Sequence, residues 1–200
     1  MNTERKIVVT GWKRGIGEKI AEVLAAAGYE VIKFEGDVSA EVDWWIAANT
    51  HPRVYGLVNC AGIASYEPLL SEDREVFLKT LEVNTLGPWM GMKHMIPGML
   101  AVGKGAIVNV TSVYAEDSGN GRATAYHASK AALSMLSRNA ARQYTGDGIR
   151  INEVRCGFIE TRMTEDYYTN PAYRSYVDRH CLMKRLGTPG EVAAAVKFLL

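Results

Sequence analysis

The sequence has 200 residues, of which 48% are hydrophobic and 22% charged, as is ordinary for one globular domain with a full hydrophobic core. With 23 Lys and Arg against 22 Asp and Glu, the formal net charge of +1 gives no electrostatic basis for binding nucleic acid or an acidic membrane surface. Three cysteines without C-x-x-C spacing, no signal-peptide pattern and no apolar run of membrane length indicate one cytoplasmic domain over residues 1–200, without a metal site.

In the first half of the chain, short β-branched runs alternate with segments of helical periodicity. A helix begins near Ile16, where apolar residues recur at helical spacing, and ends at Gly28. Ser71 is the expected N-cap of a later helix that runs past Asn84 and bends near Pro88. The strands expected in this half are 7–9, 29–34 and 54–58.

The second half continues the alternation. Strands are expected at 106–110 and 149–154, with a long helix over 124–144 between them, and Pro189 marks the start of a last helix. The segment 160–188, rich in Tyr, Arg and Thr, is expected to form a surface lid over the substrate. Because the strands are apolar on both faces, we predict a single α/β domain of three layers, with helices on both sides of a parallel sheet.

The turn that joins the first strand to the first helix carries three glycines: Gly11, Gly15 and Gly17. Glycine lets the backbone reverse tightly and lets a pyrophosphate approach the main chain, where exposed amides and the positive end of the helix hold it. The spacing is G-x-x-x-G-x-G rather than G-x-G-x-x-G, and any strand-to-helix turn can use glycine. Its place between a strand and a helix favours dinucleotide binding.

Residues near this turn bear on which dinucleotide is bound. Glu35 follows the second strand, where a carboxylate accepts both hydroxyls of the adenosine ribose and repels a 2′-phosphate, and Asp37 adds to that repulsion. Lys13 and Arg14 are cations inside the turn that could grip a 2′-phosphate, or could be ordinary surface charges. We therefore expect NAD(H), with NADP(H) as the alternative.

Tyr126 and Lys130 lie one turn apart on the predicted helix and so share a face. A tyrosine pKa of about 10 makes a poor acid or base at neutral pH, but a nearby ammonium would stabilise the phenolate and lower that pKa. Most Tyr/Lys pairs at this spacing are ordinary surface residues. Ser112 adds context, because it follows a strand at the sheet edge where open α/β proteins bind ligands, and its hydroxyl could bond a substrate carbonyl.

Two asparagines complete this group. Asn59 ends a strand in Asn-Cys-Ala-Gly, and Asn84 lies inside a helix, where Asn is usually a tolerated polar residue but could hold a water near Lys130. The ordered motifs T-G-x-x-x-G-I-G, D-V, N-x-A-G, V-N-x-x-G, N-V-T-S, Y-x-A-S-K, R-x-N and G-x-I-x-T resemble the short-chain dehydrogenase/reductase family from residue 7 to the last residue. The resemblance implies a Rossmann-like, doubly wound sheet and a homodimer or homotetramer.

The same resemblance implies roles for individual residues. Tyr126 is the expected acid/base, Lys130 lowers its pKa and binds the nicotinamide ribose, and Ser112 orients the substrate oxygen. Asn84 anchors a proton-relay water. Tyr126 then exchanges a proton with an alcohol or ketone oxygen while the neighbouring carbon exchanges a hydride with the nicotinamide. The residues expected against the cofactor are Gly11, Lys13, Arg14, Gly15, Ile16, Gly17, Glu35, Asp37, Val38, Asn59, Ala61, Gly62, Tyr126, Lys130, Gly157, Ile159 and Thr161.

Three features depart from the family pattern. Glu35 and Asp37 are nearly adjacent, whereas relatives place a helix and a strand between the two acids, so we expect the sheet to lack an edge strand. Cys156 replaces the proline before Gly157, which we expect to loosen that turn. The sequence stops at Leu200 inside an apolar helical pattern, while relatives continue through a final strand; it is either a partial sequence or truly lacks that strand.

Other functions stay compatible with the sequence. Within the family these are a reductase of acyl-carrier thioesters and a dehydrogenase of cyclic diols; from another class, a non-catalytic NAD(P)-binding sensor or assembly subunit. The intact Ser, Tyr and Lys set argues against the last. His127 follows Tyr126 but points to another face of the helix, so it is expected to be structural. Trp44 and Trp45 are expected to pack a helix on the sheet.

Overall fold

A computed structural model of the protein describes residues 6–119 and 121–200. In these residues the strands form a sheet in the order β2-β1-β3-β4-β5, with every neighbouring pair parallel. The predicted parallel α/β fold is confirmed. The strands are β1 (Lys6–Val9), β2 (Glu30–Lys33), β3 (Gly56–Asn59), β4 (Gly105–Ser112) and β5 (Ile149–Cys156).

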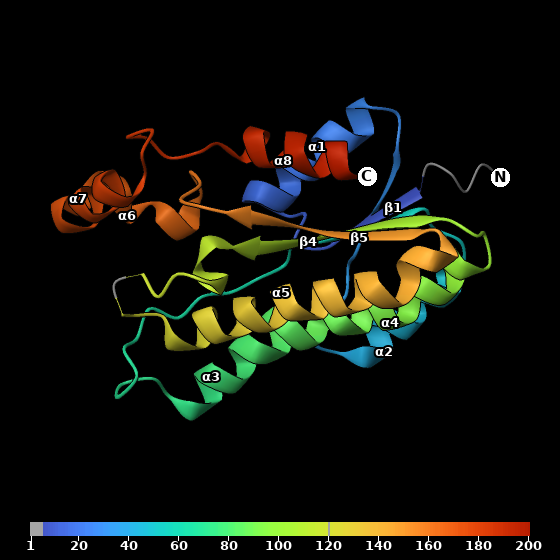
Figure 1. The fold of residues 1–200 in the computed structure, drawn as a ribbon, viewed down its shortest axis with the longest axis horizontal. Coiled ribbons are helices and arrows are strands. Elements are labelled where there is room, and N and C mark those ends of the chain that lie inside the picture. Colours follow the sequence, from blue (N-terminus) through green and yellow to red (C-terminus); the bar gives the residue numbers. More distant parts are fainter. Residues whose placement is uncertain (1–5, 120) are drawn as a thin grey trace.

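Helices cover both faces of the sheet, which gives the predicted three layers (Figure 1). One face carries α1 (Gly15–Ala26) and α8 (Pro189–Leu199). The opposite face carries α2 (Glu41–Thr50), α4 (Gly87–Leu100) and α5 (Thr124–Tyr144). The short helices of the predicted lid segment lie beyond the carboxyl ends of β4 and β5; they are α6 (Asp166–Thr169) and α7 (Pro171–His180).

Each face of the sheet has its own apolar core, because side chains alternate between the two faces along a strand. Val8 and Leu57 belong to the core under α2, α4 and α5, whereas Ile7 and Val58 belong to the core under α1 and α8. In α2, the fully buried Trp44 stacks on a phenylalanine after β2 and its indole Nε1 donates to the main-chain oxygen of Val38 at 2.9 Å. Trp45 is 58% exposed, so the expected packing on the sheet holds for one tryptophan of the pair.

The region after β2 is as short as the sequence predicts. β2 lies at the edge of the sheet, and α2 begins at Glu41 without an intervening helix or strand. Trp12 of the glycine turn ties this edge down: its indole Nε1 donates to the main-chain oxygen of Phe34 at 3.0 Å, and the Lys33 ammonium lies 4.6 Å from the centre of its ring. The missing unit therefore leaves β2 with an open edge that is fixed at its carboxyl end.

Local details differ from the sequence expectations in three places. The helix expected to start at Ser71 begins at Arg74 instead, because the Asp73 carboxylate caps it and accepts from two first-turn amides. This helix, α3 (Arg74–Leu81), reaches α4 through a π-helical turn, Glu82–Leu86, rather than a bend at Pro88. β5 continues in register with β4 as far as Cys156, two residues beyond the expected end of the strand at Val154.

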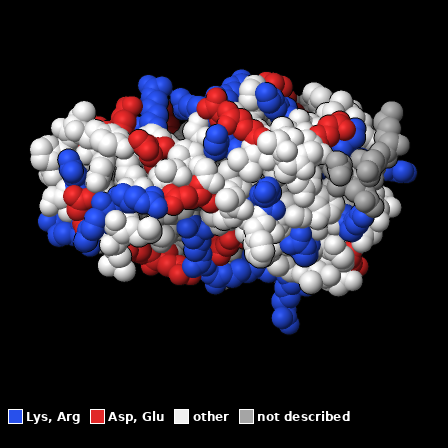
Figure 2. Space-filling model, turned by 90° about the horizontal axis from the view of Figure 1, so that it is seen from above, with Lys and Arg blue, Asp and Glu red and all other residues white. Residues whose placement is uncertain are grey.

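Surface features agree with the balanced composition. On the face that Figure 2 shows, acidic and basic side chains lie side by side without one dominant sign. No helix in the described part of the chain combines the length and the apolar character that a membrane span requires.

Candidate active site

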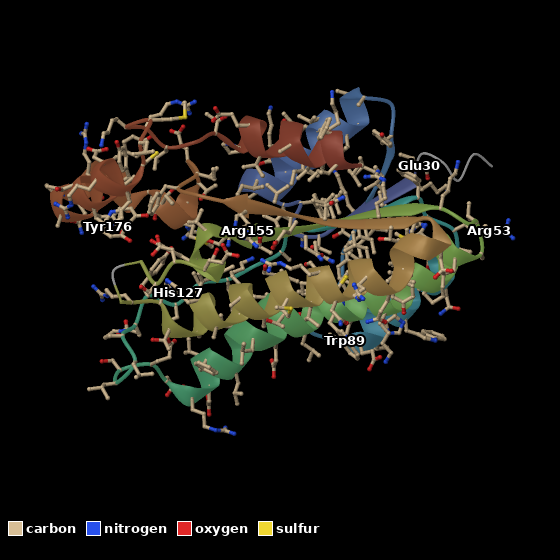
Figure 3. All side chains as sticks on the ribbon, viewed as in Figure 1. Glu30, Arg53, Trp89, His127, Arg155 and Tyr176 are labelled. Carbon is tan, nitrogen blue, oxygen red and sulfur yellow. The ribbon has the colours of Figure 1, made fainter. Side chains whose placement is uncertain are left out.

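The carboxyl ends of the central strands meet at one end of the molecule. β1, β3, β4 and β5 are mutually parallel, so their last residues and the loops that follow share one edge of the sheet, next to the lid segment (Figure 1). Figure 3 shows His127 and Tyr176 at this end and Glu30 at the opposite one. Open α/β sheets bind ligands at this edge.

The glycine turn after β1 lies in close contact with the loop after β3. The Thr10 hydroxyl accepts from the amides of Cys60 and Ala61, both at 3.0 Å, and so joins the ends of β1 and β3. Gly11 has φ +68°, and a Cβ there would lie 2.8 Å from the Ala61 Cα. A Cβ on Gly17 would lie 2.2 Å from the Gly11 oxygen. The structure thus brings the predicted turn and the N-x-A-G loop together, and neither glycine has room for a side chain.

The first turn of α1 is suited to hold an anion. Arg14 is its N-cap residue but makes no side-chain capping bond, which leaves first-turn amides directed at the turn. Across this opening, Thr161 lies next to Gly15, where a Cβ would come 3.5 Å from its Cγ2. Gly157 has no atom within 4 Å of a Cβ position. Uncapped amides, crowded glycines and open space beside the loop after β5 fit a dinucleotide pyrophosphate.

Glu35, which favours NAD(H), and Lys13, which would favour NADP(H), are neighbours in the structure. The Lys13 ammonium lies 4.0 Å from the Glu35 carboxylate, with both side chains mostly exposed. Arg14 is also exposed. An exposed pair of this length contributes little to stability, so both groups stay available to a ligand.

The D-V pair makes structural contacts of its own. The Asp37 carboxylate accepts from the hydroxyl and the amide of Ser39, at 2.6 and 2.8 Å, and lies 3.8 Å from the Lys79 ammonium. The bond from the Ser39 hydroxyl is the main reason that the pKa of Asp37 is below its usual value. Val38 is buried and its main-chain oxygen is used by Trp44. Contacts of this pair to an adenine are an expectation that the structure does not test.

Ser112, Tyr126 and Lys130 meet at the end of β4. The Ser112 hydroxyl lies close enough to the Tyr126 phenol to lower its pKa, and the Ser112 Oγ accepts from the Tyr114 amide at 3.2 Å. Lys130 is buried; its ammonium lies 5.6 Å from the centre of the Tyr126 ring and donates to the Val110 oxygen at 2.9 Å. A helix turn and a strand end thus place one phenol, one hydroxyl and one ammonium together, as the sequence predicts.

The electrostatics of Tyr126 differ from the expectation. Burial raises its pKa to about 12, and the neighbouring Ser112 hydroxyl acts in the opposite direction without cancelling it. Burial also lowers the pKa of Lys130. The Lys130 ammonium lies against the ring and donates to a main-chain oxygen, and burial is the largest influence on the Tyr126 pKa.

The two asparagines hold structure rather than facing the opening with their side chains. The Asn84 amide donates to the Ile63 oxygen at 2.8 Å and the Ser129 hydroxyl at 3.0 Å, and its oxygen accepts from the Ile63 amide at 2.9 Å. A proton-relay water would have to use its main chain, which the π-helical turn frees from regular pairing. The Asn59 side chain points into the core and donates to Asn109 at 2.8 Å, so only its backbone can line a cofactor.

Two thiols near Lys130, on half-buried Cys60 and buried Cys156, are not nucleophiles. Burial raises the pKa of Cys60 to about 12 and that of Cys156 to about 11. A thiol reacts as its thiolate, so both act as small apolar residues at neutral pH.

An ion network behind Ser112 was not predicted. Burial alone would raise the pKa of Glu153, but bonds from Arg155, Ser134 and Thr111 hold it below its usual value. Arg155 also pairs with Glu116 at 2.6 Å (Figure 3). The network fixes the segment after Ser112 to β5 and α5. Its members come from distant parts of the chain, and no local pattern reveals that they meet.

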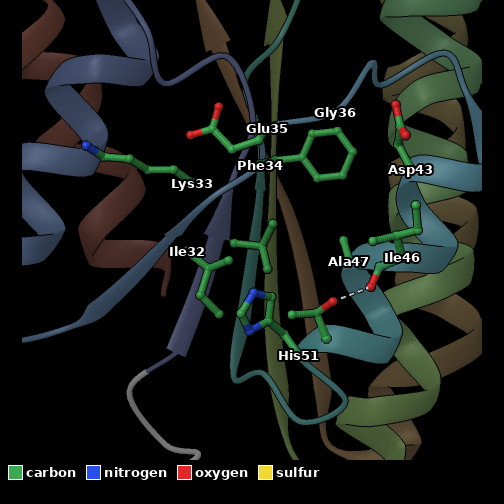
Figure 4. A pocket seen from close by; sticks show the side chains of 11 residues that line it. Ile32, Lys33, Phe34, Glu35, Gly36, Asp43, Ile46, Ala47 and His51 are labelled. Atoms are coloured by element: carbon green, nitrogen blue, oxygen red, sulfur yellow. Dashed lines mark hydrogen bonds between the residues drawn. The ribbon is translucent and has the colours of Figure 1, made fainter.

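A groove of about 220 Å³ lies between β2 and α2 (Figure 4). Ile32, Phe34 and Ile46 line it, together with Glu35 and the loop glycine that follows. It lies where the sheet edge is open and includes none of the three catalytic candidates. We attribute it to the shortened region after β2.

Comparisons with known proteins agree with this geometry. The profile of a family described as enoyl-(acyl carrier protein) reductase matches residues 34–200. The chain is 37% identical to 2-(R)-hydroxypropyl-CoM dehydrogenase of Xanthobacter autotrophicus over 177 residues, 85% of this chain and 70% of that protein. It is 34% identical to a 3-oxoacyl-[acyl-carrier-protein] reductase of Vibrio cholerae, across 100% of this chain and 91% of that protein. A solved structure from Beutenbergia cavernae with bound NADP superimposes with a TM-score of 0.89 at 25% identity, covering 99% and 90% of the two chains.

Proposed function

Because this chain belongs to the short-chain dehydrogenase/reductase family and is a nicotinamide-dependent oxidoreductase, we propose that Tyr126, Lys130 and Ser112 interconvert a secondary alcohol and its ketone. The observation that carries this proposal is the placement of the Ser112 hydroxyl next to the Tyr126 phenol, beside the buried ammonium of Lys130. The same set would have no use in a protein that only senses a cofactor.

The reaction follows from what each side chain can do. Ser112 donates a hydrogen bond to the substrate oxygen and so orients it towards Tyr126. Tyr126 gives a proton to the ketone oxygen in reduction and removes it from the alcohol in oxidation. Lys130 lies beneath the Tyr126 ring and 3.7 Å from a Cβ position on Gly62, so it can reach a ribose that rests on this loop. The nicotinamide, when bound, supplies or accepts the hydride.

Cofactor choice gives the first test. We propose NAD(H), with Glu35 at the ribose, and expect wild-type protein to bind NADH more tightly than NADPH when both are titrated by fluorescence. Glu35→Ser should lower that preference by about tenfold, since it removes a repulsive carboxylate and frees Lys13 for a 2′-phosphate. Glu30→Ser, at the far end of β2, is the matched control and should leave the ratio unchanged. Tighter NADPH binding by the wild type would assign the pocket to Lys13 and Arg14.

The raised pKa of Tyr126 gives a second test. A phenol with a pKa of about 12 is protonated at neutral pH, so its phenolate should form only under strongly alkaline conditions. We expect the phenolate absorbance of ligand-free wild type, minus that of Tyr126→Phe, to stay flat up to about pH 10. A difference signal with a midpoint near neutral pH would contradict this and restore the expected effect of Lys130.

A second candidate is the reduction of acyl-carrier thioesters. It is favoured by the alignment with a 3-oxoacyl-[acyl-carrier-protein] reductase along the whole chain. Turnover of acetoacetyl-CoA distinguishes it from a simple alcohol dehydrogenase, and it enters the experiment below.

Three further expectations remain proposals. We propose that residues 160–188 act as the lid over the substrate, since α6 and α7 lie beside the catalytic end of the sheet. A homodimer or homotetramer is supported by the groove of about 270 Å³ between α4 and α5, where Trp89, Ile96 and Leu136 lie among polar residues. A cytoplasmic location is supported by the three cysteines, none of which forms a disulfide.

A further inference from the structure

Five aromatic side chains from four separate parts of the chain form a connected cluster next to Tyr126. We call them the aromatic wall. Tyr66 comes from the loop after β3, Tyr114 follows Ser112, Phe158 follows β5, and the other two come from α7 in the lid. The members of the aromatic wall are Tyr66, Tyr114, Phe158, Tyr173 and Tyr176.

Tyr114 is the member best placed to touch a substrate. Its ring stands at 89° to that of Tyr126 with centres 6.4 Å apart, and its own amide binds the Ser112 hydroxyl. A molecule whose oxygen rests between Ser112 and Tyr126 therefore has the Tyr114 ring beside its carbon skeleton.

The Tyr114 ring is held in place from several directions. His127 stacks on it at 4.4 Å, and the edge of Phe158 meets it at 6.1 Å. Its hydroxyl lies near that of Tyr176, and a Cβ on Gly119 would lie 2.8 Å from the ring, so the loop also covers it. His127, expected to be structural, is the residue that backs this ring. Because the ring is already fixed, little conformational entropy is lost when a substrate packs against it.

The polar groups that the aromatic wall presents to a substrate are neutral phenols. Burial raises the pKa of Tyr66, Tyr114 and Tyr173, so their phenols stay uncharged at physiological pH. The ionised group that acts on Tyr66 and Tyr173 is the carboxylate of Asp166. Arg122 also reaches this loop, but its Nε donates to the main-chain oxygen of Tyr66 at 3.0 Å. Neutral phenols beside a carboxylate give an anionic substrate no opposite charge within the wall.

Resting on the function proposed above, we infer that the substrate is an uncharged, ring-bearing secondary alcohol or its ketone, and that Tyr114 selects it by contact with the ring. The apolar face of such a ring packs on the Tyr114 side chain, and further hydroxyls on it find phenols as partners. In reduction the ketone carbon takes a hydride from the reduced nicotinamide and its oxygen takes the Tyr126 proton, so the alcohol and the oxidised nicotinamide are the products. Sulfonates, carboxylates and coenzyme A thioesters are disfavoured.

The test is reduction of four ketones by the full chain, followed by loss of reduced-nicotinamide absorbance. The probes are cyclohexanone, its anionic analogue 4-oxocyclohexanecarboxylate, the open-chain 2-butanone and acetoacetyl-CoA, each with NADH and with NADPH. We expect kcat/KM for cyclohexanone to exceed that for each other probe by about tenfold or more. Tyr114→Ala should lower the cyclohexanone value by about tenfold, mainly through KM, and remove the preference, whereas Tyr114→Phe should keep it.

Trp45→Ala is the matched control, because this exposed aromatic residue lies in α2, outside both the wall and the lid. It should keep the preference, and all three variants should bind reduced nicotinamide as the wild type does. Faster turnover of the anionic ketone or of acetoacetyl-CoA would overturn the inference and direct attention to Arg122. Equal rates for all probes, no turnover despite cofactor binding, or an unchanged preference in Tyr114→Ala would also overturn it. Failure to bind either reduced nicotinamide would instead contradict the proposed function itself.

Discussion

Tyr126→Phe is expected to lower kcat by about 10²- to 10⁴-fold, the usual contribution of a positioned general acid or base. Only the hydroxyl is removed, and this is the group next to Ser112 at the point where we propose that the substrate oxygen lies. The ring keeps its place beside Tyr114 and above Lys130, so the fold and the cofactor site should not change. We therefore expect NADH binding within about twofold of the wild type and a loss confined to turnover.

Tyr144→Phe provides the control on the same helix. Tyr144 ends α5, is half-buried against the core under that helix, and lies in the groove between α4 and α5 rather than at the catalytic end. The substitution removes the same atom and should leave kcat unchanged. If Tyr126→Phe kept wild-type turnover, the proton would have to come from another group, and the assignment of Tyr126 would be wrong.

The features that the sequence predicts well are those set within a few neighbouring residues. The glycine turn needs a strand, three glycines and a helix start in one short segment, and the structure places Gly11 and Gly17 in contact there. The helix 124–144 is found with the predicted bounds, which puts Tyr126 and Lys130 on one face. The shortened region after β2 follows from simple chain length, since too few residues separate Glu35 from Asp37 to form another helix and strand.

The features that the sequence misses depend on residues that are distant in the chain. In the sequence, Lys13 and Glu35 are opposing indications of whether NADP(H) or NAD(H) is bound. In the structure they lie 4.0 Å apart, next to the same expected position of the adenosine ribose. The raised pKa of Tyr126 comes from burial, which the Y-x-x-x-K spacing cannot report. The tyrosine-rich lid indicates an aromatic pocket wall, but the sequence does not reveal that Tyr66 and Phe158, from distant loops, join Tyr173 and Tyr176 there. The N-cap at Asp73 was missed because Ser71 and Asp73 both have suitable side chains.

Gly17→Ala is expected to have the second large effect, on cofactor binding and on stability together. The new methyl group would lie 2.2 Å from the Gly11 oxygen and 2.6 Å from its carbonyl carbon, far inside contact distance. Both atoms belong to the main chain, so the turn itself must move. Overpacking of this kind costs about 1–3 kcal/mol of folding free energy. A displaced turn also moves the α1 amides away from the phosphates, so we expect NADH affinity to fall at least about tenfold.

Gly146→Ala separates this clash from the general effect of replacing glycine. Gly146 lies in a surface turn, has no positive φ, and has no atom within 4 Å of a Cβ position. Alanine fits there and restricts the unfolded chain, so the melting temperature should stay level or rise slightly, with NADH affinity unchanged. The two substitutions should therefore act with opposite sign on stability, measured by thermal unfolding with and without NADH. A Gly17→Ala protein that melts and binds NADH like the wild type would show that the turn can open, and that the close approach of Gly17 to Gly11 is not what shapes the phosphate site.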